Sequence, residues 1–152
     1  MFYTTTEIPS DLSKISEIES FVRCIMQNCK MDMQYFGILC TPLIEAVKNA
    51  IIHGNHNDIH KKVKILCQQE NEKWTFSVKD EGIGFSYEEY QKQRILGLSH
   101  GLSIISTLCD EIEFQNNGST IIFTIQLPRL KQEVPQREWA HEVIKQYLPQ
   151  LV

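Results

Sequence analysis

The sequence lacks several features that would place it in common functional classes. It has no long block of Lys and Arg, and its 152 residues carry a mixed charge with a formal net of −4, so direct binding to nucleic acid is not expected. No apolar run approaches the roughly 20 residues that span a bilayer, and "MFYTTTEIPSD" has no basic region followed by an apolar core. We therefore expect a cytoplasmic protein of one main domain with no membrane contact.

Paired cysteines and metal-binding spacings are also missing. The five cysteines form no C-x-x-C pair, and an odd number suits neither a disulfide framework nor a zinc site, so buried free thiols are expected. In "HGNHNDIH", the imidazoles of His53, His56 and His60 are close in sequence. Gly54 and the loop-forming Asn and Asp residues nevertheless interrupt the helix there, which argues against a histidine metal cluster.

Apolar periodicity predicts helices first and strand pairs afterwards. Steps of three and four predict a helix over Ile15–Cys29, and Thr41-Pro42 predicts a kink or a helix start before a second helix that stops at Gly54. Alternation predicts a hairpin of "VKILCQ" with "WTFSVKD", then a helix at "HGLSIISTLCDE" and a hairpin of "IEFQ" with "STIIFTIQL" around the turn "NNG". This order favours an α+β two-layer sandwich, with a mostly antiparallel sheet and helices on one face.

The chain is expected to leave the sheet after Pro128. In this interpretation residues 1–128 form the main domain and residues 129–152 form a helical tail, in which Trp139, Val143, Tyr147 and Leu151 recur at helical intervals. Docking of this tail on the domain is favoured, and contact of its apolar stripe with a partner is the alternative.

A narrow polar stripe crosses the second predicted helix. Residues four apart advance about 40° around a helix, so Glu45, Asn49 and His53 of "LIEAVKNAIIHGN" share one strip of an otherwise apolar helix. A carboxylate or a carboxamide that faces a dry core costs several kcal/mol unless it is paired. The stripe therefore indicates a polar cavity or a ligand site, with a self-satisfied buried network as the alternative.

A carboxylate and two glycines follow the second predicted strand. The inward positions of "WTFSVKD" lead in phase to Asp80, and Gly82 and Gly84 then allow a sharp turn and the close approach of a ligand. A buried acceptor needs a donor. The exocyclic amine of a purine would supply one, with Ile83 and Phe85 available as apolar walls.

A third glycine-rich element opens the next predicted helix. Gly101 in "GLSHGLSIIST" lies at a helix N-terminus, where free N–H groups attract phosphate. In this order "EAVKNAIIHGN", "DEGIGF", "SHGLSII" and "NGSTIIFTI" resemble the N box, the two glycine boxes and the closing strand of the gyrase and histidine-kinase type ATPases, the Bergerat fold. More narrowly, the chain resembles the anti-sigma factor serine kinases of bacterial partner-switching systems, from Thr4 to Leu127.

The resemblance implies a site for ATP and Mg²⁺. It implies that Glu45 is the base that orients the attacking hydroxyl, that Asn49 ligates Mg²⁺, and that His53 supports the Mg²⁺ side. It implies that Asp80 accepts a hydrogen bond from the adenine amine. The other residues implied to bind the nucleotide are Gly82, Gly84, Phe85, Ser99, Gly101, Leu102 and Thr120.

The resemblance also implies a function and partners. The implied function is that of a serine/threonine kinase, which phosphorylates a serine on a small antagonist protein. The implied partners are this antagonist, a sigma factor or an analogous target that the kinase sequesters, and a second copy of the chain in a homodimer. Ser99 stands where the second glycine box usually has its first glycine, and segment 86–100 is short, with Lys92 and Arg94 as its only cations. A nucleotide-weak, non-catalytic binding module of the same fold is therefore the alternative, and the ATPase domain of a histidine kinase acting in trans is a third hypothesis.

Overall fold

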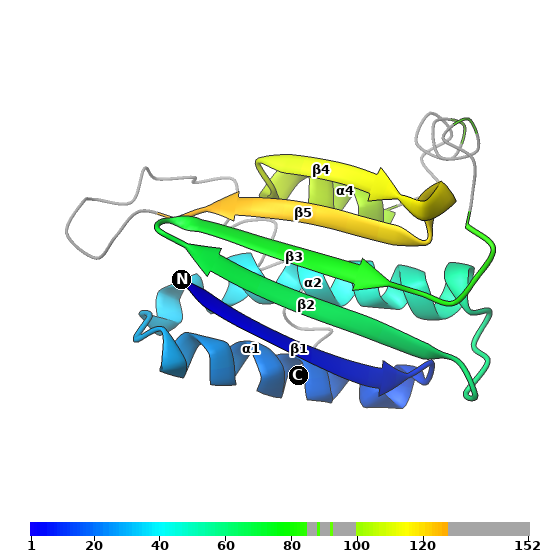
Figure 1. Cartoon of the computed structure of the whole chain (residues 1–152), viewed down its shortest axis with the longest axis horizontal. Coiled ribbons are helices and arrows are strands. Elements are labelled where there is room, and N and C mark those ends of the chain that lie inside the picture. The colour runs from blue at the N-terminus through cyan, green and yellow to red at the C-terminus, as the bar shows by residue number, and fades with distance from the viewer. Residues whose placement is uncertain (85–87, 89–91, 93–99, 128–152) are drawn as a thin grey trace.

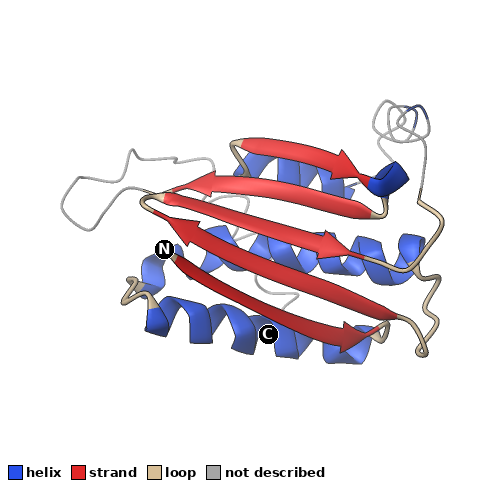
Figure 2. Cartoon of the chain, viewed as in Figure 1, coloured by secondary structure: helices blue, strands red, loops and turns tan. Residues whose placement is uncertain are grey.

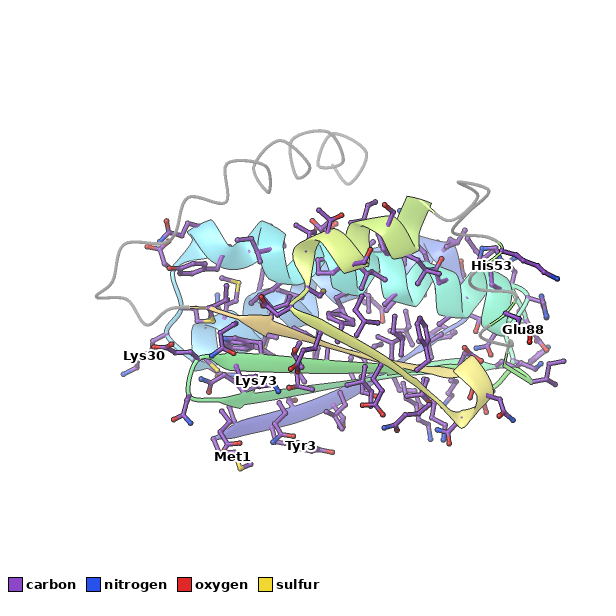
Figure 3. The ribbon with its side chains drawn as sticks, turned by 90° about the horizontal axis from the view of Figure 1, so that it is seen from above. Met1, Tyr3, Lys30, His53, Lys73 and Glu88 are labelled. Atoms are coloured by element: carbon purple, nitrogen blue, oxygen red, sulfur yellow. The ribbon has the colours of Figure 1, made fainter. Side chains whose placement is uncertain are left out.

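The computed structural model describes residues 1–84, 88, 92 and 100–127, and these form two layers. One layer is a five-stranded antiparallel sheet in the order β1-β2-β3-β5-β4, and the helices α1, α2 and α4 cover one of its faces (Figures 1 and 2). Figure 3 shows the helices in one layer and the strands in the other. The α+β two-layer sandwich that the sequence predicts is confirmed.

The elements follow one another along the chain in an order close to the predicted one. The strands are β1 (Phe2–Pro9), β2 (Lys62–Glu70), β3 (Lys73–Lys79), β4 (Glu111–Gln115) and β5 (Thr120–Gln126). The α-helices are α1 (Ile15–Asn28), α2 (Phe36–Asn49) and α4 (His100–Leu108). Shorter helical turns are Leu12–Lys14, Met33–Tyr35, the π-helical turn Ala50–Gly54 and Asn116–Gly118.

The core lies between the helices and the inward face of the sheet. Phe76 of β3 and Phe123 of β5 are register partners at its centre, and their rings stack with centroids 5.4 Å apart. The buried residues of α1 recur at steps of three and four, as predicted, and those of β3 alternate; they are Ile18, Val22, Ile25 and Met26, and Trp74, Phe76 and Val78. Burial of one face of each element therefore accounts for the predicted helix and hairpins.

The start of α2 differs from the prediction. A helix start at Thr41-Pro42 is wrong, because α2 begins at Phe36 and continues through Pro42. An interior proline removes one helical hydrogen bond and costs about 3 kcal/mol. Burial of the neighbouring side chains Leu39, Leu43 and Ile44 offsets that cost. The predicted stop at Gly54 is confirmed by the end of the π-helical turn.

The central helical stretch is unusually apolar. Met33–Gly54 is long enough by itself to cross a membrane, and its most apolar 18-residue window has a mean hydropathy of 1.3. However, 61% of its most apolar window is buried inside the fold, which is also the pattern of a core helix. Length and composition are therefore weak support for a membrane span here.

Strand β1 is absent from the sequence prediction. It forms one edge of the sheet and pairs with β2, with Ile8 opposite Val63 and Thr4 opposite Cys67. A period of two is present, since Phe2, Thr4, Thr6 and Ile8 alternate with more exposed residues. Threonines on the inward side weaken the apolar contrast on which recognition of a strand depends. The predicted tail helix lies outside the described residues.

Candidate functional site

Two segments predicted to form one site meet where α2 packs against α4. Glu45 and Asn49 of α2 face Gly101, in the first turn of α4. A Cβ added at Gly101 would lie 2.9 Å from Oε2 of Glu45 and 3.4 Å from Nδ2 of Asn49. Because Oε2 is the end of a flexible side chain, a Cβ at Gly101 would displace the Glu45 carboxylate, and glycine leaves that carboxylate in place. The structure thus brings together the polar stripe and the second glycine box.

The carboxylate of Glu45 is partly enclosed, with 16% of its side chain exposed. Its Oε1 accepts a hydrogen bond from Nζ of Lys48 at 3.2 Å, and its Oε2 faces Gly101. The two oxygens therefore have different surroundings: one is engaged by a cation and the other lies at the junction of the two helices. The sequence analysis did not identify Lys48, although a lysine three residues after a glutamate on a helix is a recognisable pairing signal.

Asn49 carries a buried polar atom that finds no partner within the described part of the chain. This atom is Nδ2, and it lies beside Gly101. Leaving such a group unpaired costs about 1–3 kcal/mol, which a ligand could recover. Rotation of the carboxamide would exchange its nitrogen and oxygen, so the same place can offer a hard oxygen to a divalent cation. The residues present therefore fit a Mg²⁺–phosphate group.

Asp80 lies at the other end of the site, directly after β3. Only 8% of the residue is exposed, and its Oδ1 accepts a hydrogen bond from the N–H of Gly82 at 2.8 Å. Its own N–H donates to the carbonyl of Ser119 at 2.9 Å. Burial raises the pKa of the Asp80 carboxyl, and the Gly82 hydrogen bond and the charges of Lys61 and His56 lower it only in part. Asp80 is thus a buried acceptor with unused capacity.

Two glycines make room around this carboxylate, and a third packs against the β4–β5 turn. A Cβ at Gly54 would collide with the carboxyl group of Asp80, and a Cβ at Gly82 would collide with the carbonyl of Gly54. Gly84 has a φ of +81°, and a Cβ there would collide with the carbonyl of Asn117. The first glycine box therefore packs against the end of the π-helical turn and against the β4–β5 turn. The sequence predicts a sharp turn and the close approach of a ligand at Gly82 and Gly84; the structure shows close packing against other backbone there, and the approach of a ligand stays a prediction.

Two hydroxyl-bearing residues, Ser119 and Thr120, lie at the start of β5. Strand alternation places Thr120 on the opposite face from Ile121, and the Thr120 hydroxyl accepts a hydrogen bond from Nδ2 of Asn116 at 3.1 Å. Ser119 directly precedes β5; its carbonyl accepts a hydrogen bond from the N–H of Asp80, and its hydroxyl donates to the carbonyl of Asn116 at 2.9 Å. Ser119 is therefore a backbone neighbour of Asp80 that the sequence analysis missed. The nucleotide-binding role of Thr120 stays a prediction.

The remaining predicted residues differ in how buried they are, and two of them lie outside the described part of the chain. His53 is exposed in the π-helical turn that follows α2 (Figure 3), because this turn takes it off the regular stripe that its spacing predicts. Leu102 is half-buried and packs against the core. Ile83 is 95% exposed, so its prediction as an apolar wall is wrong. Phe85 and Ser99 lie outside the described residues.

Asn55 is a buried residue near this site that the sequence analysis did not single out. It follows Gly54 directly, is 0% exposed and hydrogen-bonds to the backbone N–H of Glu81, the residue after Asp80. Its position in "GNHND" is typical of a loop, where Asn is a common turn former. Nothing local to this segment shows that its side chain points inward.

The fold and these residues define a class of protein. One end of the site has a buried carboxylate beneath a glycine turn, and the other has a carboxylate and a carboxamide beside a helix N-terminus, as expected of a Bergerat-fold ATPase. The sequence pattern of the histidine kinase-like ATPase domain matches residues 8–125. The chain belongs to this family, and the ATPase domain implies that it binds ATP.

The similar curated relatives include anti-sigma F factors. The anti-sigma F factor of Oceanobacillus iheyensis is 29% identical over 139 residues, covering 82% of this chain and 95% of the relative. That of Geobacillus sp. (strain WCH70) is 30% identical over 129 residues, covering 76% and 88%. That of Bacillus subtilis (strain 168) is 27% identical over 139 residues, covering 82% and 95%. Within the ATPase family, the chain is thus related to anti-sigma factors.

Proposed function

We propose that the protein is an ATP-dependent serine/threonine kinase of the anti-sigma factor type. It phosphorylates a serine on a small antagonist protein and sequesters a sigma factor or an analogous target. The observation that carries this proposal is the junction of Glu45, Asn49 and Gly101, where a carboxylate oxygen and an unpaired carboxamide lie beside a helix N-terminus. The anti-sigma F factor relatives support the choice of partners.

The adenine end of the site depends on Asp80. Its buried carboxylate accepts a hydrogen bond from the exocyclic amine of the base, while Gly82 holds its Oδ1 in place. The absence of side chains at Gly54 and Gly82 makes room for the Asp80 carboxyl group itself in this position. A guanine would present a carbonyl oxygen at the same position, so a carboxylate there selects adenine over guanine.

The phosphate end depends on α2 and α4. Asn49 would hold Mg²⁺ through its carboxamide oxygen, and the N-terminal turn of α4 at Gly101 would offer backbone N–H groups to phosphate oxygens. When bound, Mg²⁺ neutralises developing charge on the transferred phosphoryl group. Glu45 accepts the proton of the attacking serine hydroxyl through Oε2, the oxygen that Lys48 does not engage.

The ion pair between Lys48 and Glu45 favours a second candidate function. A carboxylate that already has one oxygen held at 3.2 Å by an ammonium group is less free to bind a hydroxyl. A non-catalytic partner-switching module that binds nucleotide weakly would tolerate such a pair. The two candidates differ in whether phosphoryl transfer occurs, and in whether that transfer needs Glu45.

The first experiment is calorimetric titration with ATP and ADP, with and without Mg²⁺. We expect wild-type binding that is weakened about 10- to 150-fold in Asp80→Asn and that no longer depends on Mg²⁺ in Asn49→Ala. Phosphoryl transfer from labelled ATP is then measured on an antagonist protein that co-purifies with the chain. Loss of transfer in Glu45→Gln with nucleotide binding retained supports the kinase. Binding without any transfer in the wild type supports the non-catalytic module.

A further inference from the structure

Asn55 uses its whole side-chain carboxamide inside the fold. Its Nδ2 donates to Oγ of Ser10 at 2.7 Å and to the carbonyl of Lys62 at 3.0 Å, and its Oδ1 accepts from the N–H of Glu81 at 2.7 Å. Its backbone N–H donates to the carbonyl of Ala50 at 2.8 Å, so both of its ends are fixed. A buried polar side chain with both functions satisfied is an ordered connection between segments.

Three of these residues form a closed ring of hydrogen bonds. Asn55 donates to the carbonyl of Lys62, the N–H of Lys62 donates to Oε2 of Glu81, and the N–H of Glu81 donates to Oδ1 of Asn55. The register partner of Lys62 on β1 is Pro9, which has no N–H. The carbonyl of Lys62 therefore receives nothing from Pro9 across the strand pair and is available to Asn55.

The ring includes the peptide bond next to Asp80, the residue proposed to accept a hydrogen bond from adenine. The N–H of Glu81 belongs to the peptide bond that joins Asp80 to Glu81, and the following N–H, of Gly82, donates to Oδ1 of Asp80. Asn55 in turn follows Gly54, the residue whose missing Cβ accommodates the Asp80 carboxyl. The backbone that follows Asp80 is thereby held by Asn55, the residue directly after the π-helical turn.

We propose that Asn55 is a positioning residue for recognition of the nucleotide base. It acts through the N–H of Glu81 to hold the Asp80 carboxylate in the orientation that accepts the adenine amine. The inference rests on the proposed nucleotide site and adds a residue that does not itself touch the nucleotide. Only a carboxamide offers a donor and an acceptor in one plane at this reach, so neither Asp nor Ser would make the full set of bonds.

The hydrogen bond to Ser10 provides a matched control. Ser10 is buried, and its hydroxyl accepts from Asn55 and donates to the carbonyl of Lys61 at 2.9 Å, but it does not bind Glu81. Ser10→Ala and Asn55→Ala each remove buried hydrogen bonds and should both lower the melting temperature. Only Asn55→Ala removes the bond to the peptide next to Asp80, so only this variant should change base recognition.

The experiment is titration of the full chain with ADP and GDP in the presence of Mg²⁺, alongside thermal melting. We expect Asn55→Ala to weaken ADP binding about 5- to 10-fold and to reduce the preference for ADP over GDP. Ser10→Ala should keep the wild-type preference despite a lower melting temperature. An unchanged preference in a folded Asn55→Ala protein, or an equal loss in Ser10→Ala, would overturn the inference.

A second variant covers the case in which Asn55→Ala does not fold. Glu81 has an exposed side chain, so Glu81→Ala should fold while removing the acceptor for the Lys62 N–H and opening the ring. We expect a smaller loss of ADP preference, and a wild-type preference would count against the ring. Failure of the wild type to bind ADP at millimolar concentration would overturn the proposed function itself, which separates the two results.

Discussion

Replacement of Asp80 by Asn should separate stability from nucleotide binding. Asparagine has nearly the same shape and keeps an oxygen for the N–H of Gly82, but it presents an N–H₂ group where the carboxylate accepted. A hydrogen bond to a charged group contributes about 1.5–3 kcal/mol. Because each 1.4 kcal/mol is a factor of ten, ADP affinity should fall about 10- to 150-fold.

The same substitution should stabilise the protein in the absence of nucleotide. Burial raises the folded pKa of Asp80 above its ordinary value of 3.8, so the folded state holds the proton more tightly than the unfolded chain. The contribution of Asp80 to stability is therefore fully present below pH 3.8 and is lost as pH rises through the folded pKa. The carboxamide that replaces it does not titrate, so Asp80→Asn should melt above the wild type at neutral pH.

The assay is thermal melting of both proteins between pH 3.5 and pH 7.5 without nucleotide, paired with calorimetric titration of ADP. The gap in melting temperature should shrink as the pH falls toward 3.8. The charges of Lys61 and His56 lower the pKa of Asp80, so a His56→Gln background controls for the influence of the imidazole. A gap that stays constant across this range, or a less stable Asp80→Asn protein at pH 7, would refute the reasoning.

Three further predictions concern α2, α4 and the core. Gly101→Ala places a Cβ against Oε2 of Glu45 and should lower phosphoryl transfer about tenfold or more while circular dichroism shows a retained fold; full activity would contradict the close packing. Lys48→Met frees Oε1 and should raise transfer about twofold, whereas Lys14→Met removes a matched i,i+3 pair on the surface and should leave transfer unchanged; equal effects would argue against a role for Lys48. Phe76→Ala should lower the free energy of unfolding by about 3–5 kcal/mol in urea titration, and a loss below 1 kcal/mol would contradict its central position.

Elements with strong contrast between their two faces could be predicted from the sequence. The helix α1 and the strand β3 each bury one face completely, and their predicted extents agree with the structure to within a residue or two. Strand β1 has threonines on its inward side and was missed. The start of α2 was misplaced because burial on both sides of Pro42 outweighs the local preference of proline.

The residues of the candidate site also fall into those that the sequence could predict and those that it could not. Residues that share a helix, such as Glu45 and Asn49, are related by spacing alone, and the glycine boxes are recognisable by resemblance to a family. Asn55 could not be found by either route, since Ser10 and Glu81 are 45 and 26 residues away from it in the chain. Its role depends on which strands become neighbours, and that is fixed only when the sheet assembles.

The position of Gly54 at the end of the helical segment that carries Asn49 has a consequence for tolerance to length changes. Asn49 lies at the phosphate end of the proposed site, and Gly54 touches the acceptor at the adenine end. The segment between them is the continuous backbone of the π-helical turn, so the span of the site is set by a residue count. One inserted or deleted residue here would move the two ends relative to each other and rotate Gly54 away from Asp80. The turn between β2 and β3 lies apart from these residues and can change in length without altering that span.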